Sequence, residues 1–193
     1  MKKIIFSFCF AIVLTLHSSA QGFATNTTLC DSCTNEVSFS IESTSFLKNN
    51  EYFNDFSKGQ TAIGFFIKPT FDYYFSEKTK ATVGVYAFKY SGLDDFSQVI
   101  PIFRLQHQFN KRLQMVMGNI FGAMNHQLIE PLFSFDRYYE NNTEYGLQFI
   151  YKTSKIKSDT WLNWEKFIFT DSPYQEEFVF GNSSGINAFQ SEN

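Results

Sequence analysis

The chain has 193 residues, with 16 basic and 19 acidic side chains and a formal net charge of −3. The basic residues form no stripe or cluster, so the sequence predicts no nucleic-acid partner. Aromatic residues make up 19% of the chain and include 25 phenylalanines, yet the mean hydropathy is only −0.21. So many large rings exceed the needs of a soluble core of this size and favour a protein whose exterior is apolar.

Residues 1–20 have the layout of a secretory signal peptide. Lys2 and Lys3 precede an apolar run over residues 4–16, and Ala20 ends a small-residue cleavage site. The apolar run is shorter than the ~20 residues that a membrane-spanning helix needs. We therefore expect residues 1–20 to be removed on export.

Residues 21–35 are small and polar, and they are expected to form a flexible leader. Cys30 and Cys33 form a C-x-x-C pair, which can be a redox dithiol, half of a metal site or a local disulfide. A redox pair opens a helix in a βαβ unit, and the sequence has no such pattern here. In an oxidising compartment the simplest expectation is a disulfide between Cys30 and Cys33.

From residue 36 onward the dominant hydrophobic period is two. In residues 59–75, Phe65 and Phe71 share one face, while Lys68 and Asp72 share the other. The same alternation recurs along the chain and gives about eight candidate strands. Each strand would present one apolar and one polar face.

The length of the strand in residues 59–75 favours a membrane setting. It could run for about 12–15 residues, whereas strands of soluble domains cluster near 5–6 residues. A tilted strand that crosses a bilayer needs ~9–11 residues within it. Pro69 cannot donate to a neighbouring strand, so we expect a bulge or a lost ladder bond beside it.

Connections of alternating length separate the candidate strands. Long connections are expected at residues 48–59, 91–98 and 120–142, short turns at 76–79, 110–112 and 154–157, and a medium loop at 170–175. Outer-membrane barrels have short periplasmic turns and longer external loops. The sequence therefore predicts an all-β fold, an antiparallel up-and-down transmembrane β-barrel over residues 36–183. It would have about eight strands, either complete or the first part of a longer barrel, followed by a polar tail at 184–193.

The segment 120–142 is the least certain part of this pattern. It could hold an extra pair of strands around residues 132–139, or a helix that places His126 and Glu130 on one face. Ser134, His126 and Asp136 could form a hydrolase triad, although no nucleophile-elbow pattern supports one. The sequence favours no catalytic residue, no metal site and no cofactor.

Charged residues on the polar faces would point into the barrel lumen. They could line a route for solutes, or pair with one another and fill the interior, as a barrel of ~8 strands is only wide enough for side chains. These candidate lumen-lining residues are Lys68, Asp72, Arg104, Glu144, Lys152, Asp159, Glu165 and Glu177.

Aromatic residues near the strand ends are expected to lie at the two membrane–water boundaries. Such girdles are typical of outer-membrane barrels. The candidates are the pairs Tyr73–Tyr74, Tyr138–Tyr139 and Trp161–Trp164, together with Phe75.

Taken together, the pattern resembles the outer-membrane β-barrel proteins of Gram-negative bacteria, in particular the porin-like group. The signal peptide, the hairpins around 76–79 and 110–112, and the segment 159–165 carry the resemblance. It implies an outer-membrane location, membrane lipid and the outer-membrane insertion machinery as partners, and no covalent chemistry. It leaves the oligomeric state open. The chain departs from this group because it ends on a polar segment without an aromatic terminal strand.

The sequence thus predicts passive solute passage or a structural role at the cell surface, and no enzyme. One alternative is a secreted soluble β-sandwich that binds carbohydrate or protein through loops rich in Tyr and Trp. A further alternative is an outer-membrane enzyme that acts on lipid through residues 120–142.

Overall fold

The computed structural model describes residues 27–30, 32–54, 57–134, 136–140 and 142–187. The expected signal peptide lies outside these ranges, as do residues 188–193 of the expected tail.

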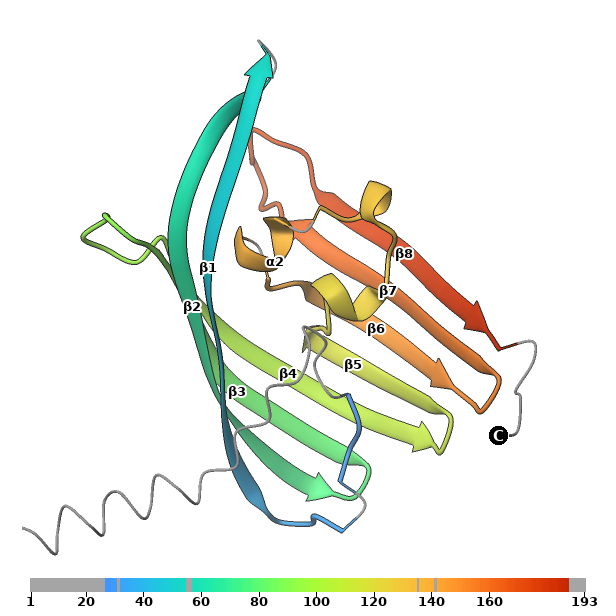
Figure 1. The fold of residues 1–193 in the computed structure, drawn as a ribbon. Helices are drawn as coiled ribbons and strands as arrows, with labels where there is room; N and C mark the ends of the chain where they lie inside the picture. The colour runs from blue at the N-terminus through green and yellow to red at the C-terminus, as the bar shows by residue number, and fades with distance from the viewer. Residues whose placement is uncertain (1–26, 31, 55–56, 135, 141, 188–193) are drawn as a thin grey trace, which may run out of the picture.

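Within the described residues, eight antiparallel strands form one sheet in which each strand pairs with the next along the chain (Figure 1). The strands are β1 (Val37–Asn54), β2 (Ser57–Ser76), β3 (Thr79–Tyr90), β4 (Gln98–Asn110), β5 (Leu113–Asn119), β6 (Tyr145–Lys152), β7 (Ile156–Lys166) and β8 (Glu177–Ile186). The predicted all-β, up-and-down fold is confirmed. The sheet curves strongly, and β1 and β8 are its two edges, with no ladder between them among the described residues.

Three short helices occupy the long connection between β5 and β6. They are η1 (Ala123–His126), η2 (Glu130–Leu132) and α2 (Asp136–Glu140). Figure 1 shows this connection folded into the hollow of the curved sheet. The extra strand pair considered for residues 132–139 is therefore wrong. No helix of the described residues is both long and apolar enough to cross a membrane.

The outer face of the sheet carries large apolar side chains. Residues directly opposite each other on neighbouring strands share a face. One such row runs Phe39, Phe71, Val83 and Phe103 across β1 to β4. All four side chains are exposed. Residues 105, 117, 147, 162 and 180 continue the apolar face as a row across β4 to β8.

The inner face holds two clusters of buried side chains. One gathers around Phe66 and Tyr86 and includes Tyr138 of α2. The other contains Val116, Phe121 and Trp161. Tyr138 and Trp161 are each 5% exposed, so their expected place in an aromatic girdle is wrong. Tyr138 is buried because α2 folds into the hollow of the sheet. Trp161 is buried because it is one of the alternate residues of β7 that face this hollow.

The expected connections match the structure closely at the short turns and differ at two places. The predicted loop at 48–59 is wrong because β1 and β2 continue to Asn54 and from Ser57. The polar tail begins later than expected, since β8 extends to Ile186. Both errors arise because backbone pairing holds polar residues in strands.

Pro69 interrupts the pairing of β2 with only one of its two neighbouring strands. It lies opposite Ile41 of β1, but the ladder between β2 and β3 records no pair for Pro69. The register is the same before and after this gap, so the predicted lost ladder pairing is present without a bulge. Gly84 on β3 allows the close approach, because a Cβ there would lie 2.3 Å from the backbone oxygen of Pro69.

Candidate active site

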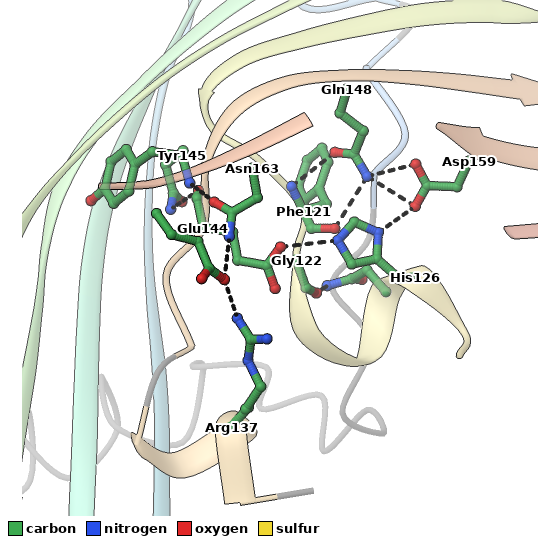
Figure 2. Close-up of polar contacts among 12 residues, drawn as sticks. Phe121, Gly122, His126, Arg137, Glu144, Tyr145, Gln148, Asp159 and Asn163 are labelled. Atoms are coloured by element: carbon green, nitrogen blue, oxygen red, sulfur yellow. Dashed lines mark hydrogen bonds and ion pairs between the residues drawn. The ribbon is translucent and has the colours of Figure 1, made fainter. Parts of the chain in front are cut away.

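The chain leaves β5 and turns into the hollow of the sheet, which brings His126 against β6 and β7 (Figure 2). The amide of Ile120 donates to the backbone oxygen of Glu144 at 2.9 Å, which anchors the start of this connection. Gln127 ends η1 in the left-handed region, with φ of 52°. The short helix thus ends with His126 directed at the inner face of the sheet.

His126 lies between two carboxylates. Its Nδ1 is 2.8 Å from Oδ2 of Asp159, and its Nε2 is 3.2 Å from Oε2 of Glu144. The imidazole is 2% exposed and stacks on the indole of Trp161, with ring centroids 3.6 Å apart. Both ring nitrogens and one ring face therefore have fixed partners.

Gln148 holds Asp159 in place from the neighbouring strand. Its Nε2 donates to both carboxylate oxygens of Asp159, at 2.9 and 3.0 Å. The same amide accepts from the backbone N–H of Phe121 at 2.9 Å and donates to its backbone oxygen at 3.2 Å. Gln148 is fully buried, so one side chain couples Asp159 to the segment that leads to His126.

Two glycines leave room for the side chains around the histidine. A Cβ on Gly122 would lie 2.6 Å from the carboxylate carbon of Glu144. A Cβ on Gly181 of β8 would lie 2.3 Å from the indole of Trp161. Side chains larger than hydrogen at these positions would displace Glu144 or Trp161.

The two carboxylates change the protonation of His126. Burial alone would lower the pKa of the imidazole, but the hydrogen bonds and charges of Asp159 and Glu144 outweigh burial and raise the pKa above its ordinary value of 6.5. The protonated ring is therefore more favoured than in a free histidine. Once deprotonated, it is a stronger base than a free histidine.

The triad considered from the sequence does not form. Asp136 forms an ion pair with Lys48 at 2.7 Å. Ser134 follows η2 in the sequence, and its side chain is exposed. His126 is bound instead by Asp159 and Glu144, which come from β7 and the residue before β6. Among the described residues, no Ser, Thr or Cys side chain is recorded as a hydrogen-bond partner of His126.

Four residues of this site were not linked to His126 by the sequence. Glu144 and Asp159 were expected in the lumen, while Gln148 and Trp161 were not singled out as partners. The signal that could have found them is strand parity. Gln148 lies opposite Trp161 in the β6–β7 ladder, and Asp159 has the same inward parity two residues earlier.

The other candidate lumen-lining residues fall into three places. Lys68, Asp72 and Arg104 line one polar cavity on the inner face. Lys152 lies exposed at the turn end of β6, whereas Glu165 pairs with Arg137 and Glu177 pairs with Lys166 near the opposite end of the sheet. Cys30 and Cys33 are joined by a disulfide. The described residues contain no group of three or more His, Cys, Asp or Glu side chains that could hold a metal.

By its fold and site, the chain is an all-β protein with an antiparallel up-and-down sheet and a buried site of one histidine and two carboxylates. Residues 25–193 match the family model of the lipid A 3'-O-deacylase type. The chain belongs to this family. A search of the curated proteins gave no match to the chain.

This family corrects two expectations. Passive, porin-like passage without covalent chemistry is wrong as the leading function, and so is the expectation of no enzyme, because the family is named for a deacylase. The error has a physical origin. The residues around His126 come from positions 144, 148 and 159, and only the pairing of β6 with β7 brings them together.

Proposed function

We propose that the protein is an outer-membrane hydrolase that cleaves an ester-linked acyl chain from a lipid A-type glycolipid. The observation that carries the proposal is the position of His126 between Asp159 and Glu144. An imidazole oriented at one nitrogen by a buried carboxylate is the arrangement that general-base catalysis of acyl transfer requires. Family membership supplies the substrate class.

The two carboxylates have different roles in this proposal. Asp159 is the positioning residue, since it lies at 2.8 Å from Nδ1 and is itself held by Gln148. This contact keeps the proton on Nδ1 and leaves Nε2 to act as the base. Glu144 makes the longer contact to Nε2, at 3.2 Å. It is therefore the partner that yields when water and the ester enter.

A water molecule is the nucleophile that the site favours, because no hydroxyl or thiol of the described residues is bound to His126. Nε2 takes a proton from this water as its oxygen attacks the ester carbonyl carbon. The tetrahedral intermediate then breaks its bond to the sugar oxygen, and the proton on Nε2 passes to that oxygen. The products are a free fatty acid and a sugar hydroxyl, and His126 returns to its starting state.

The exterior of the sheet supports a lipid setting. The exposed row of Phe39, Phe71, Val83 and Phe103 on the convex face is a surface that a bilayer would cover, and strands of 7 to 20 residues include several long enough to cross it. We extend the proposal to membrane lipid as a partner and to the outer-membrane insertion machinery as the route of assembly.

The test is mass spectrometry of lipid A after incubation with the folded protein in detergent micelles. We expect the mass of one acyl chain to be lost from the lipid and the matching fatty acid to appear. His126→Gln should abolish the release. His107→Gln is the matched control, since His107 lies on β4 and its side-chain hydrogen bond within the described residues is to Thr79 at 2.9 Å, and it should retain activity. Equal release by wild type and His126→Gln would refute the proposal.

A fluorophosphonate probe tests the nucleophile separately. Such probes label an activated serine, so direct attack by water predicts an active enzyme that remains unlabelled. A labelled serine that is lost together with activity would overturn the water mechanism and leave the hydrolase proposal in place.

A further inference from the structure

A polar cavity of about 180 Å³ lies on the inner face of the sheet, apart from His126. Strands β1 to β5 all contribute to its wall. Its charged lining consists of three cations and two carboxylates, namely Lys68, Lys80, Arg104, Glu42 and Asp72. The cavity therefore has one positive charge in excess.

Two of the cations are already neutralised by neighbours. Lys68 pairs with Glu42 at 2.5 Å, and Lys80 pairs with Asp72 at 3.2 Å. Among the described residues, no carboxylate lies within ion-pair distance of Arg104, so this guanidinium carries the excess charge. Asp72 and Glu42 attract Arg104 without forming an ion pair with it. A buried cation without a direct partner is costly to keep.

Arg104 is held in one orientation. Its Nε donates to the backbone oxygen of Asn119 at 2.5 Å, and its Nη2 donates to Oδ1 of Asn119 at 2.8 Å. The guanidinium also lies over the ring of Phe121, 4.0 Å from the centroid. These contacts leave Nη1 without a protein partner among the described residues, on a side chain that lines the cavity.

We propose that this cavity binds a phosphate-type oxyanion through Arg104, with Lys68 and Lys80 contributing charge. A rigid guanidinium presents donors whose geometry matches oxyanions. The hydroxyls of Ser40 and Thr70 line the same cavity and are hydrogen-bonded to each other at 2.8 Å, so one of the two keeps its O–H for a ligand. The volume holds a phosphate with accompanying water, given that one water occupies about 30 Å³ in the liquid. The inference does not depend on the proposed hydrolysis.

The binding site also touches the loop that carries His126. Asn119, which holds Arg104, donates from Nδ2 to the backbone oxygen of Glu144 at 3.1 Å. Phe121, which stacks on Arg104, is bound by Gln148. An occupied cavity would therefore stabilise the segment between β5 and η1.

The experiment is a calorimetric titration of the folded protein with inorganic phosphate, in an uncharged, phosphate-free detergent. We expect saturable binding of one phosphate per chain. Arg104→Gln should weaken it by about tenfold or more, the effect of losing a charge-assisted contact. Arg104→Lys keeps the positive charge but lacks the planar guanidinium, so it should weaken phosphate binding less than Arg104→Gln does. Lys78→Gln, at the exposed β2–β3 turn, is the control and should bind as wild type does.

Folded mobility on a gel run without boiling shows whether each variant retains its fold. A folded Arg104→Gln protein that binds phosphate as tightly as wild type would overturn the proposal, and so would a flat titration of wild type. Lys152 lines a basic surface with Lys111, Arg112 and Lys155 at the turn end. Loss of binding in Lys152→Gln alone would place the anion there and equally overturn the proposal.

The same chemistry could come from the free ion or from a lipid phosphate. Phosphorylated and dephosphorylated lipid A, added at equal concentration, distinguish these sources. Competition by the phosphorylated lipid alone assigns the cavity to a lipid headgroup. Absence of competition by either lipid assigns it to the free ion.

Discussion

At the scale of single residues, the site depends on how His126 is held. Two carboxylates and an indole contact one imidazole that is 2% exposed. Burial of a charge is tolerated only when it is paired and hydrogen-bonded. The His126 site meets this condition, because each charged group has a partner of opposite charge.

The raised pKa of His126 sets the expected pH dependence of hydrolysis. The base must be deprotonated, so activity should rise with pH through the raised pKa and level off above it. Asp159→Asn removes the strongest of the contacts that raise this pKa, so its profile should shift to lower pH at a reduced maximum. Initial rates between pH 5 and 10, expressed as kcat/KM, check this prediction. Superimposable profiles for the two proteins would contradict the role of Asp159.

The sequence identified only part of the site. His126 was considered as one of two histidines beyond the expected signal peptide, four residues before Glu130, and Glu144 and Asp159 were expected to be inward-facing charges. Their meeting point could not be predicted, since a histidine in an irregular loop has no periodicity that fixes its direction. Ser134 and Asp136 were close to His126 in sequence, yet proximity along an irregular loop does not determine spatial contact.

At the scale of elements, the pairing of β6, β7 and β8 builds the wall behind His126. Gln148 of β6 lies opposite Trp161 of β7, which lies opposite Gly181 of β8. The absence of a side chain at Gly181 gives the indole its space. The stack of Trp161 on His126 thus depends on Gly181 of the neighbouring strand β8.

Gly181→Ala tests this dependence. The added methyl would lie 2.3 Å from the indole, so we expect a loss of about 1–3 kcal/mol in the free energy of unfolding from overpacking. Gly185→Ala is the matched control on β8, because nothing lies within 4 Å of its added Cβ. Its unfolding free energy should change by about 0.5 kcal/mol or less. Urea unfolding monitored by tryptophan fluorescence measures both, and equal effects would contradict the packing role of Gly181.

Strands and short turns were the most predictable elements. Alternation of apolar and polar residues indicates a strand when its two faces meet different surroundings. The turns at 76–79 and 110–112 were predicted at the positions where this alternation ends. The extension of β1 to Asn54 and of β2 back to Ser57 was missed because most residues of 48–54 and 57–59 are polar or glycine. Their strand structure comes from backbone pairing, which side-chain periodicity does not report.

At the scale of the whole molecule, the outer face of the sheet is apolar and exposed, whereas the inner face carries both apolar clusters and charged side chains. The exposed row through Phe71, Val83 and Phe103 lies outside, while Lys68, Asp72 and Arg104 face a cavity. Strand parity and length predicted an outward apolar row and inward charges, but not the apolar clusters of the inner face. The catalytic character was not predictable at this scale, since fold alone does not fix function.

The membrane setting predicts a cost that depends on depth. Val83 lies near the middle of β3 and is 50% exposed, whereas Phe75 lies beside the short turn and is 54% exposed. Val83→Arg should destabilise the folded protein in bilayers by about 2–4 kcal/mol, and Phe75→Arg by about 0–1 kcal/mol. Reversible unfolding from lipid vesicles measures both values. Equal, small costs at the two positions would indicate that water covers this face.

The most direct test of the hydrolase is the lipid A of living cells. Wild type, His126→Gln and His107→Gln would be produced in the outer membrane of a Gram-negative host, and lipid A would be extracted and analysed by mass spectrometry. Wild type and His107→Gln should yield lipid A that lacks one acyl chain, and His126→Gln should yield the unmodified lipid. Unmodified lipid A in all three strains, with folded protein present in each outer membrane, would contradict the account.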